Sequence, residues 1–289
     1  MIDLILDAGL DGVLDTLKLI PFLLITYLLM EYLEARMQNK TKEKLHKAGK
    51  WGPLWGAVLG MLPQCGFSAA ASNLYAGRVV TIGTLIAIYL STSDEMLPIM
   101  ISEAVSPVFI AGVLAVKVVS GMIVGILVDR IFAKAMKIEE HDVDIHHFCE
   151  HEHCKCGHGI IRPAIKHTLQ ISLFVLLVTV ALNIVIGLLG TSALADFILN
   201  KPIIGELLAG IIGLIPNCAA SVVITQLYLE GAMQLGTMIA GLLVGAGVGV
   251  LVLFRVNEDK KENFAIVAIL YCSGVVIGML INLIVGIVM

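Results

Sequence analysis

Two short stretches of this chain place a helix-breaking proline among polar side chains inside long apolar runs. They read Gly60-Met61-Leu62-Pro63-Gln64-Cys65-Gly66-Phe67-Ser68 and Gly213-Leu214-Ile215-Pro216-Asn217-Cys218-Ala219-Ala220-Ser221. Each proline removes a backbone donor and disturbs the preceding turn, which frees carbonyl groups beside an amide, a thiol and a hydroxyl. Non-helical backbone inside a membrane is tolerated only where it is buried in protein or faces a water-filled cavity. We therefore predict that these stretches, called the first and second tips, meet inside a membrane and hold a polar substrate.

The tips, with one matched amide beyond each of them, supply the residues that we expect to bind this substrate. These residues are Gln64, Cys65, Ser68, Asn73, Asn217, Cys218, Ser221 and Gln226. Helix N-termini favour anions whereas freed carbonyls favour cations, so the charge of the substrate stays open at this point. Two structural alternatives also stay open: the prolines are packing kinks beside small buried cysteines, and the amides bond one helix to another.

A third polar stretch, Ser91-Thr92-Ser93-Asp94-Glu95, interrupts another apolar run. An ionisable side chain at membrane depth is costly and is therefore a candidate for function. The break of the second half that falls in the same region, around Gly245-Ala246-Gly247-Val248-Gly249, has neither charge nor hydroxyl. We expect Ser91, Ser93, Asp94 and Glu95 to bind a metal or a coupling cation, with Asp94 as the main ligand. The alternative is that the two carboxylates lie at the outer surface and are merely solvated.

The hydrophilic segment between the halves carries nine nitrogen or sulfur atoms that could bind metal. They belong to His141, His146, His147, Cys149, His151, His153, Cys154, Cys156 and His158. Imidazole and thiolate suit zinc, copper, nickel, cobalt and iron. No spacing matches a structural zinc module, because only one residue separates Cys154 from Cys156. We expect a low-specificity metal-binding or sensing loop, and a solvated histidine-rich linker is the alternative.

Composition places the chain in a membrane. Of its 289 residues, 58% are hydrophobic and 15% charged, and the mean hydropathy is +0.95, whereas soluble domains have about 45–50% apolar and 25% charged residues. Several runs of 18 or more residues lack a charge, which indicates transmembrane helices. The net charge of −4 and the lack of a basic patch interleaved with aromatic residues argue against nucleic acid as a partner. The start, Met1-Ile2-Asp3, lacks the basic residues of a cleavable signal peptide.

An internal duplication organises the chain. A shift of 153 residues places Gly60 on Gly213, Pro63 on Pro216 and Cys65 on Cys218. Coincident Gly, Pro and Cys in fixed register indicate a repeat rather than chance matching of apolar residues. We expect an all-α polytopic membrane protein with a first transmembrane repeat at 1–133, a cytoplasmic loop at 134–163 and a second transmembrane repeat at 164–289.

Loop charges predict that the two repeats have inverted topology. Six basic residues lie between Arg36 and Lys50, whereas the matching loop at about 191–203 has only Lys201. Basic loops stay in the cytoplasm, so the first of these is inside and the second outside. An even number of crossings must then separate 34–51 from 132–165, and we expect 52–76 to enter and return as a re-entrant hairpin. This gives about five helices in each half, with broken helices at the midplane and both termini outside.

The two tips and the His/Cys-rich loop resemble the family of ten-transmembrane heavy-metal exporters, whose members are commonly labelled arsenic efflux proteins or manganese transporters. The resemblance covers nearly the whole chain and is most specific at Pro63-Gln64-Cys65-Gly66 and Pro216-Asn217-Cys218. It implies export of a metal or metalloid across the cytoplasmic (inner) membrane of a bacterium or archaeon. It supplies no set of binding residues, so the site rests on the physical argument above.

We therefore expect a secondary exporter of divalent or heavy-metal cations that works by alternating access. No nucleotide-binding loop, zincin motif or nucleophile elbow is present, so we expect no enzyme activity and no tightly bound cofactor. Transition-metal ions such as Zn, Mn or Co are the expected cargo or loop ligands, membrane lipid is the expected surrounding, and a homo-oligomer stays open. One alternative is an exporter of arsenite, phosphate or a small organic anion coupled to H⁺ or Na⁺. Another is a membrane metal sensor that transports nothing.

Overall fold

The computed structural model describes residues 2–36, 51–62, 65–93, 95–135, 161–189 and 204–288, and all the regular structure in them is helical. The His/Cys-rich loop, Gln64 and Asp94 lie outside these residues. The first half contains α1 (Ile2–Arg36), α3 (Gly52–Gly60), α4 (Cys65–Ala76), α5 (Ile82–Ser91), α6 (Met96–Ser102) and α7 (Pro107–Ala135). The second half contains α9 (Ile161–Leu189), α11 (Ile204–Gly213), α12 (Cys218–Leu229), α13 (Leu235–Val244), α14 (Val248–Val256) and α15 (Lys260–Val288).

The two halves have the same order of helices: one long, four short and one long. Three helices of the second half, α12, α13 and α15, begin and end 153 residues after α4, α5 and α7. The sequence predicted about five helices in each half, with the apolar segment around Ser91–Glu95 counted as one span. The structure divides that segment into α5 and α6, since Thr92 leaves helical geometry with φ −57° and ψ 128°.

Six segments of the described chain are long and apolar enough to cross a membrane, so the protein is a multi-pass membrane protein. They are Gly12–Leu29, Ile82–Ser102, Pro107–Ile131, Ala164–Ile184, Leu235–Val256 and Lys260–Ile287. The second and fifth of these contain the breaks between α5 and α6 and between α13 and α14, and they are the most buried of the six. The short helices α3 and α11 reach only about 15 Å, roughly half of a hydrocarbon core.

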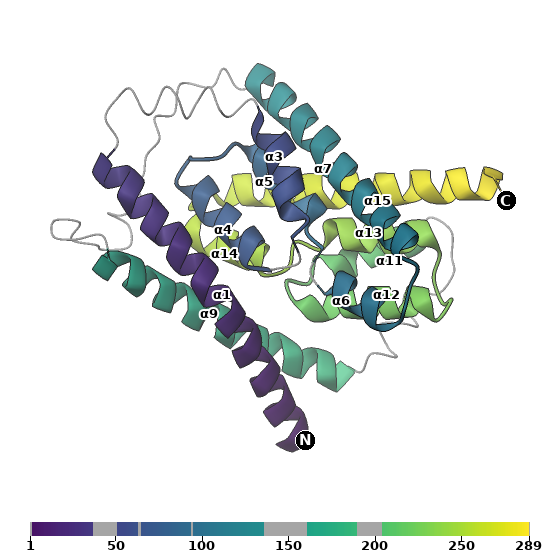
Figure 1. The fold of residues 1–289 in the computed structure, drawn as a ribbon, viewed down its shortest axis with the longest axis horizontal. Helices are drawn as coiled ribbons and strands as arrows, with labels where there is room; N and C mark the ends of the chain where they lie inside the picture. The colour runs from purple at the N-terminus through teal and green to yellow at the C-terminus, as the bar shows by residue number, and fades with distance from the viewer. Residues whose placement is uncertain are drawn as a thin grey trace.

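Figure 1 shows the short helices in the middle of the view, with the crossed pair α1 and α9 at one side of them and α7 at the other, while α15 runs across the middle and is crossed by α7. The crossed pair runs antiparallel. Near the start of α1, Gly12 contacts Val180 late in α9. Further along α1, the ring of Tyr27 stacks on His167 early in α9, with 5.3 Å between the ring centroids. The two long helices α1 and α9 therefore run in opposite directions along their contact.

Small residues let the long helices approach the broken ones closely. A Cβ added at Gly125 of α7 would lie 2.5 Å from the Gly83 carbonyl of α5, and one added at Gly278 of α15 would lie 2.5 Å from the Gly236 carbonyl of α13. The same helices share a matched hydrogen bond. Asp129 Oδ1 accepts from the Gly83 N–H at 2.8 Å, and Asn282 Oδ1 accepts from the Gly236 N–H at 2.7 Å. This packing fixes the start of each broken span against a long helix.

A Gly125→Ala variant should destabilise the protein by about 1–3 kcal/mol, because the new methyl group must push α5 away from α7. Gly112→Ala is the matched control on the same helix, since a Cβ added there meets nothing within 4 Å. Thermal unfolding of the purified variants in detergent measures the difference. Equal melting temperatures for the two variants would contradict the close packing of α5 on α7.

Candidate functional site

Helical backbone is interrupted at four places: the described residues of the breaks after α5 and α13 are mostly buried, whereas Met61 and Leu62 of the first tip are exposed. They lie between α3 and α4, α5 and α6, α11 and α12, and α13 and α14, and their described residues, with Ser68, Ser72, Tyr89, Ser91 and Ser221, form what we call the break cluster. In the first half, Ser93 Oγ donates to the Met61 carbonyl at 2.6 Å, which joins the first tip to the end of α5. In the second half, a Cβ added at Gly245 would lie 3.6 Å from Ser221 Oγ, in ordinary contact. Each tip therefore lies beside the break of its own half.

The two halves also touch within the break cluster. The Tyr89 hydroxyl of α5 donates to the Gly249 carbonyl of α14 at 3.1 Å, and Ser72 Oγ of α4 lies 2.7 Å from both groups. A Cβ added at Gly249 would lie 2.7 Å from Ser68 Cβ, so only glycine fits between α14 and α4. These contacts hold the start of α14 against the helix that follows the first tip.

Three buried hydroxyls at the end of α5 all donate their hydrogens to backbone carbonyls. Ser91 Oγ donates to the Ala87 and Ile88 carbonyls at 2.8 and 3.0 Å, and Thr92 Oγ1 donates to the Ile88 carbonyl at 2.7 Å. Ser93 Oγ donates to the first tip, as described above. A hydroxyl has one hydrogen and two lone pairs, so each oxygen faces any further partner only as an acceptor. Groups of this kind attract a cation.

The second tip is fixed by the amide of Asn217. Its Oδ1 accepts from the Ala219 N–H at 3.3 Å and so caps the start of α12, and its Nδ2 donates to Asn183 Oδ1 of α9. The backbone of Asn217 is extended, with φ −147° and ψ 145°. Cys218 and Ser221 follow on α12 and are buried. The tip therefore ends one helix and begins the next without exposing its amide.

The structure buries most of the predicted site residues that it describes. Ser68, Ser91, Ser93, Asn217, Cys218 and Ser221 are buried at or next to the interruptions, and Glu95 is half-buried. Cys65 begins α4, but its side chain is outside the description. Gln64, Asp94 and the His/Cys-rich loop also lie outside it, and their roles stay predictions. Within the described residues, no three His, Cys, Asp or Glu side chains lie close enough to hold a metal.

The two matched amides have different surroundings. Asn73 Oδ1 accepts from the Tyr27 hydroxyl of α1 at 2.8 Å, and its Nδ2 donates to the Ala69 carbonyl at 3.1 Å. Asn73 thus bonds one helix to another, which is the alternative that the sequence left open. Its counterpart Gln226 is exposed.

Sequence reasoning missed Lys117, the lysine in the apolar run of α7. Its side chain is only 1% exposed, and its Nζ donates to the Leu242 carbonyl of α13 at 2.5 Å. The same rule that singled out Asp94, an ionisable residue inside an apolar span, could have found it.

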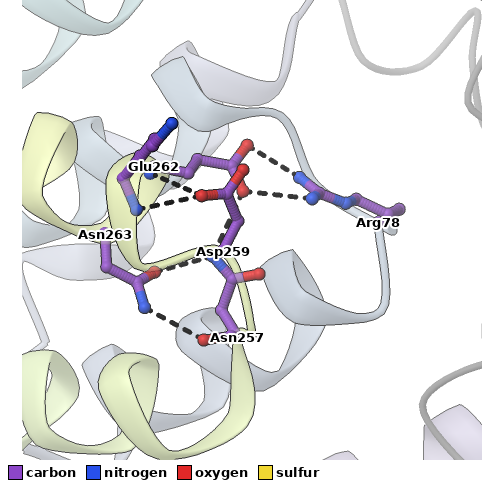
Figure 2. A network of polar contacts seen from close by, with 6 residues as sticks. Arg78, Asn257, Asp259, Glu262 and Asn263 are labelled. Atoms are coloured by element: carbon purple, nitrogen blue, oxygen red, sulfur yellow. Dashed lines mark hydrogen bonds and ion pairs between the residues drawn. The ribbon is translucent and has the colours of Figure 1, made fainter.

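An ion pair joins the halves at one end of the molecule (Figure 2). The Arg78 guanidinium, after α4, donates through both terminal nitrogens to the Glu262 carboxylate of α15, at 2.9 and 3.0 Å. Asn257 Nδ2 donates to the same carboxylate at 3.1 Å. Burial alone would lower the pKa of Arg78, but its hydrogen bonds to Glu262 and the charge of that carboxylate raise it above the ordinary value. The arginine is therefore permanently charged.

The equivalent position of the other half has an aromatic contact. A shift of 153 residues takes Arg78 to Gly231, and both have left-handed backbone, with φ of 56° and 75°. Beside Gly231, the ring of Tyr228 stacks on Phe109 at the start of α7, with 5.7 Å between centroids. Phe109 is the counterpart of Glu262, so equivalent positions are held by charge at one end and by apolar stacking at the other.

Comparison with known proteins gives one family. The sequence model of a family described as "Putative, 10TM heavy-metal exporter" matches residues 3–166 and again residues 159–287. No curated protein and no solved structure is detectably similar to the chain.

Replacing Glu262 by Gln should destabilise the folded protein by about 1–3 kcal/mol, because a bidentate bond to a charged group is lost and the half-buried Arg78 keeps its charge. Lys260→Gln is the control, since Lys260 is exposed in the same turn. A double-mutant cycle with Arg78→Gln, read by thermal unfolding, measures the coupling between the two side chains. Strictly additive effects would show that the pair does not stabilise the contact between the halves.

Proposed function

Because the chain belongs to the family of 10TM heavy-metal exporters, we propose that it is a secondary active transporter that exports divalent or heavy-metal cations by alternating access. The break cluster is its binding site. The observation that carries this proposal is the orientation of the hydroxyls of Ser91, Thr92 and Ser93, each of which donates its hydrogen to a carbonyl.

These hydroxyls indicate whether the cargo is a cation or an anion. An anion needs donors, and at the end of α5 the hydroxyl hydrogens are already engaged. A cation needs acceptors, and three buried oxygens remain available together with the carbonyls freed where α5 ends. The carboxylates of Glu95 and Asp94, the next residues along the chain, would complete the charge of the site. This reading favours a cation exporter over an exporter of arsenite, phosphate or an organic anion.

The ligand types bear on which cations enter. Hydroxyl, carbonyl and carboxylate oxygens suit hard ions such as Mn²⁺, whereas thiolates suit softer ions such as Zn²⁺. Cys218 begins α12 at the second tip and Cys65 begins α4 at the first, so each tip has a thiol in addition to its backbone carbonyls. We propose that Mn²⁺ and softer divalent ions share the break cluster, with the His/Cys-rich loop collecting or sensing metal in the cytoplasm.

Inverted repeats would give this site access to each side in turn. The antiparallel crossing of α1 and α9 supports this arrangement, because equivalent spanning helices run in opposite directions only when the axis relating them lies in the membrane plane. The ion pair of Arg78 with Glu262 and the stack of Phe109 on Tyr228 would then lie near opposite surfaces. Each would open in one of the two states.

The first test is metal flux into proteoliposomes. We expect Mn²⁺ to move, and Asp94→Asn and Ser91→Ala each to lower the rate at least about tenfold, equivalent to about 1.4 kcal/mol of lost binding per ligand. Glu103→Gln is the control, because Glu103 is an exposed acid beyond α6. The proposal is wrong if Mn²⁺, Zn²⁺, Co²⁺ and Cd²⁺ all fail to move and Asp94→Asn affects no other substrate. Arsenite or phosphate flux would favour the anion exporter, and metal binding without flux would favour the sensor.

The second test concerns topology. A cysteine replacing Lys44 and one replacing Lys201 should react with a membrane-impermeant maleimide from opposite sides of the membrane, because inversion places the matching loops on opposite surfaces. Labelling of the parent chain gives the background from the native cysteines. Reaction of both new cysteines from the same side would exclude inverted repeats.

A further inference from the structure

The buried lysine of α7 lies at a position where a cation is needed. Lys117 is 1% exposed, and its Nζ lies 2.5 Å from the Leu242 carbonyl in the last turn of α13. That helix ends at Gly245, whose N–H still bonds the Gly241 carbonyl but whose ψ of 86° is not helical. The carbonyls that follow Gly241 therefore lose their helical partners and give this end a partial negative charge. The Lys117 ammonium group donates to this end of α13 and offsets its partial negative charge.

The end of α5 is the counterpart of this position in the first half. A shift of 153 residues takes Lys117 to Leu270 of α15 and Tyr89 of α5 to Leu242 of α13. Leu270 is fully buried on α15, which packs against α5, so the residue equivalent to Lys117 is apolar. The end of α5 has acceptor hydroxyls instead, at Ser91 and Thr92. The fold thus has two equivalent helix ends, one with a built-in cation and one with acceptor oxygens.

We propose that Lys117 is a tethered cation that occupies the second of two equivalent cation positions, so that the protein binds one cargo cation, at the end of α5, rather than two. The identity of the α5 end as the cargo position rests on the function proposed above. The occupation of the α13 end by Lys117 does not. In this role Lys117 is a specificity-determining residue: it fixes how many ions the break cluster accepts.

The stoichiometry of Mn²⁺ binding tests this. The full-length protein in detergent is equilibrated with Mn²⁺, and bound metal per chain is measured for the parent and for Lys117→Met, which removes the charge at similar volume. We expect one additional Mn²⁺ per chain in Lys117→Met and no change in Lys117→Arg, which keeps a cation. Metal bound by the His/Cys-rich loop is common to all variants and cancels in the difference. An unchanged or lower number in Lys117→Met overturns the proposal.

A reciprocal variant tests the role of Lys117 separately from the proposed cargo position at the end of α5. Leu270→Lys should place an ammonium at the end of α5 and remove one bound Mn²⁺. If Lys117→Met gains an ion while Leu270→Lys loses none, the tethered cation stands and the proposed cargo position falls. If Leu270→Lys loses an ion while Lys117→Met gains none, the cargo position at the end of α5 is supported and the tethered-cation role of Lys117 is wrong. If neither number changes, both proposals are wrong.

A double variant covers the case in which Lys117→Met alone fails to fold for want of a cation at α13. The double variant Lys117→Met/Leu270→Lys keeps one ammonium and moves it to the other end. It should bind as many Mn²⁺ ions as the parent, because one position closes and the other opens. One ion fewer than the parent would show that the α13 end does not accept metal.

Discussion

The structure depends on one constraint: backbone carbonyls and N–H groups inside an apolar environment need partners within the protein. Four broken helices create free groups at their ends, and those ends cannot face lipid. They are satisfied by one another and by nearby side chains, as when Ser93 donates to Met61, Tyr89 to Gly249 and Lys117 to Leu242. These bonds join the first tip to the end of α5, and they join the end of α13 and the start of α14 to the first half. A polar site therefore follows from the chain's own need for hydrogen bonds.

Comparison of the two repeats shows which packing contacts they share and which residues differ between them. Close packing of α5 on α7 recurs in α13 on α15, with Asp129 and Asn282 accepting the same backbone bond. The break residues are not matched in this way: Ser93 corresponds to Ala246, and Asp94 to Gly247, whose φ of 53° suits glycine. One half supplies acceptor oxygens, and the other supplies a backbone turn and receives the lysine.

Much of this frame could be predicted from the sequence, because it depends on local signals in fixed register. Prolines and glycines 153 residues apart predicted the breaks, and α12 begins at Cys218, two residues after Pro216 of the second tip. The surroundings of individual polar residues could not be predicted. Asn73 and Gln226 are matched in the repeat, yet Asn73 meets Tyr27 of α1 whereas Gln226 is exposed. That difference arises from how α1 packs on α4, a contact between segments distant in the chain.

The two ends of the contact between the halves have different costs of opening. Separating Arg78 from Glu262 breaks a bidentate bond but exposes two charges that water solvates well, so their hydration offsets much of the lost interaction. Separating Phe109 from Tyr228 exposes aromatic area and loses a stack worth about 0.5–1.5 kcal/mol beyond that area. In an alternating-access cycle the ionic end would open more readily, so the empty protein would favour one state. Cargo can shift that balance only by binding one state more tightly than the other. Differences at the surface positions, and not only at the break cluster, would then decide which side the empty site faces.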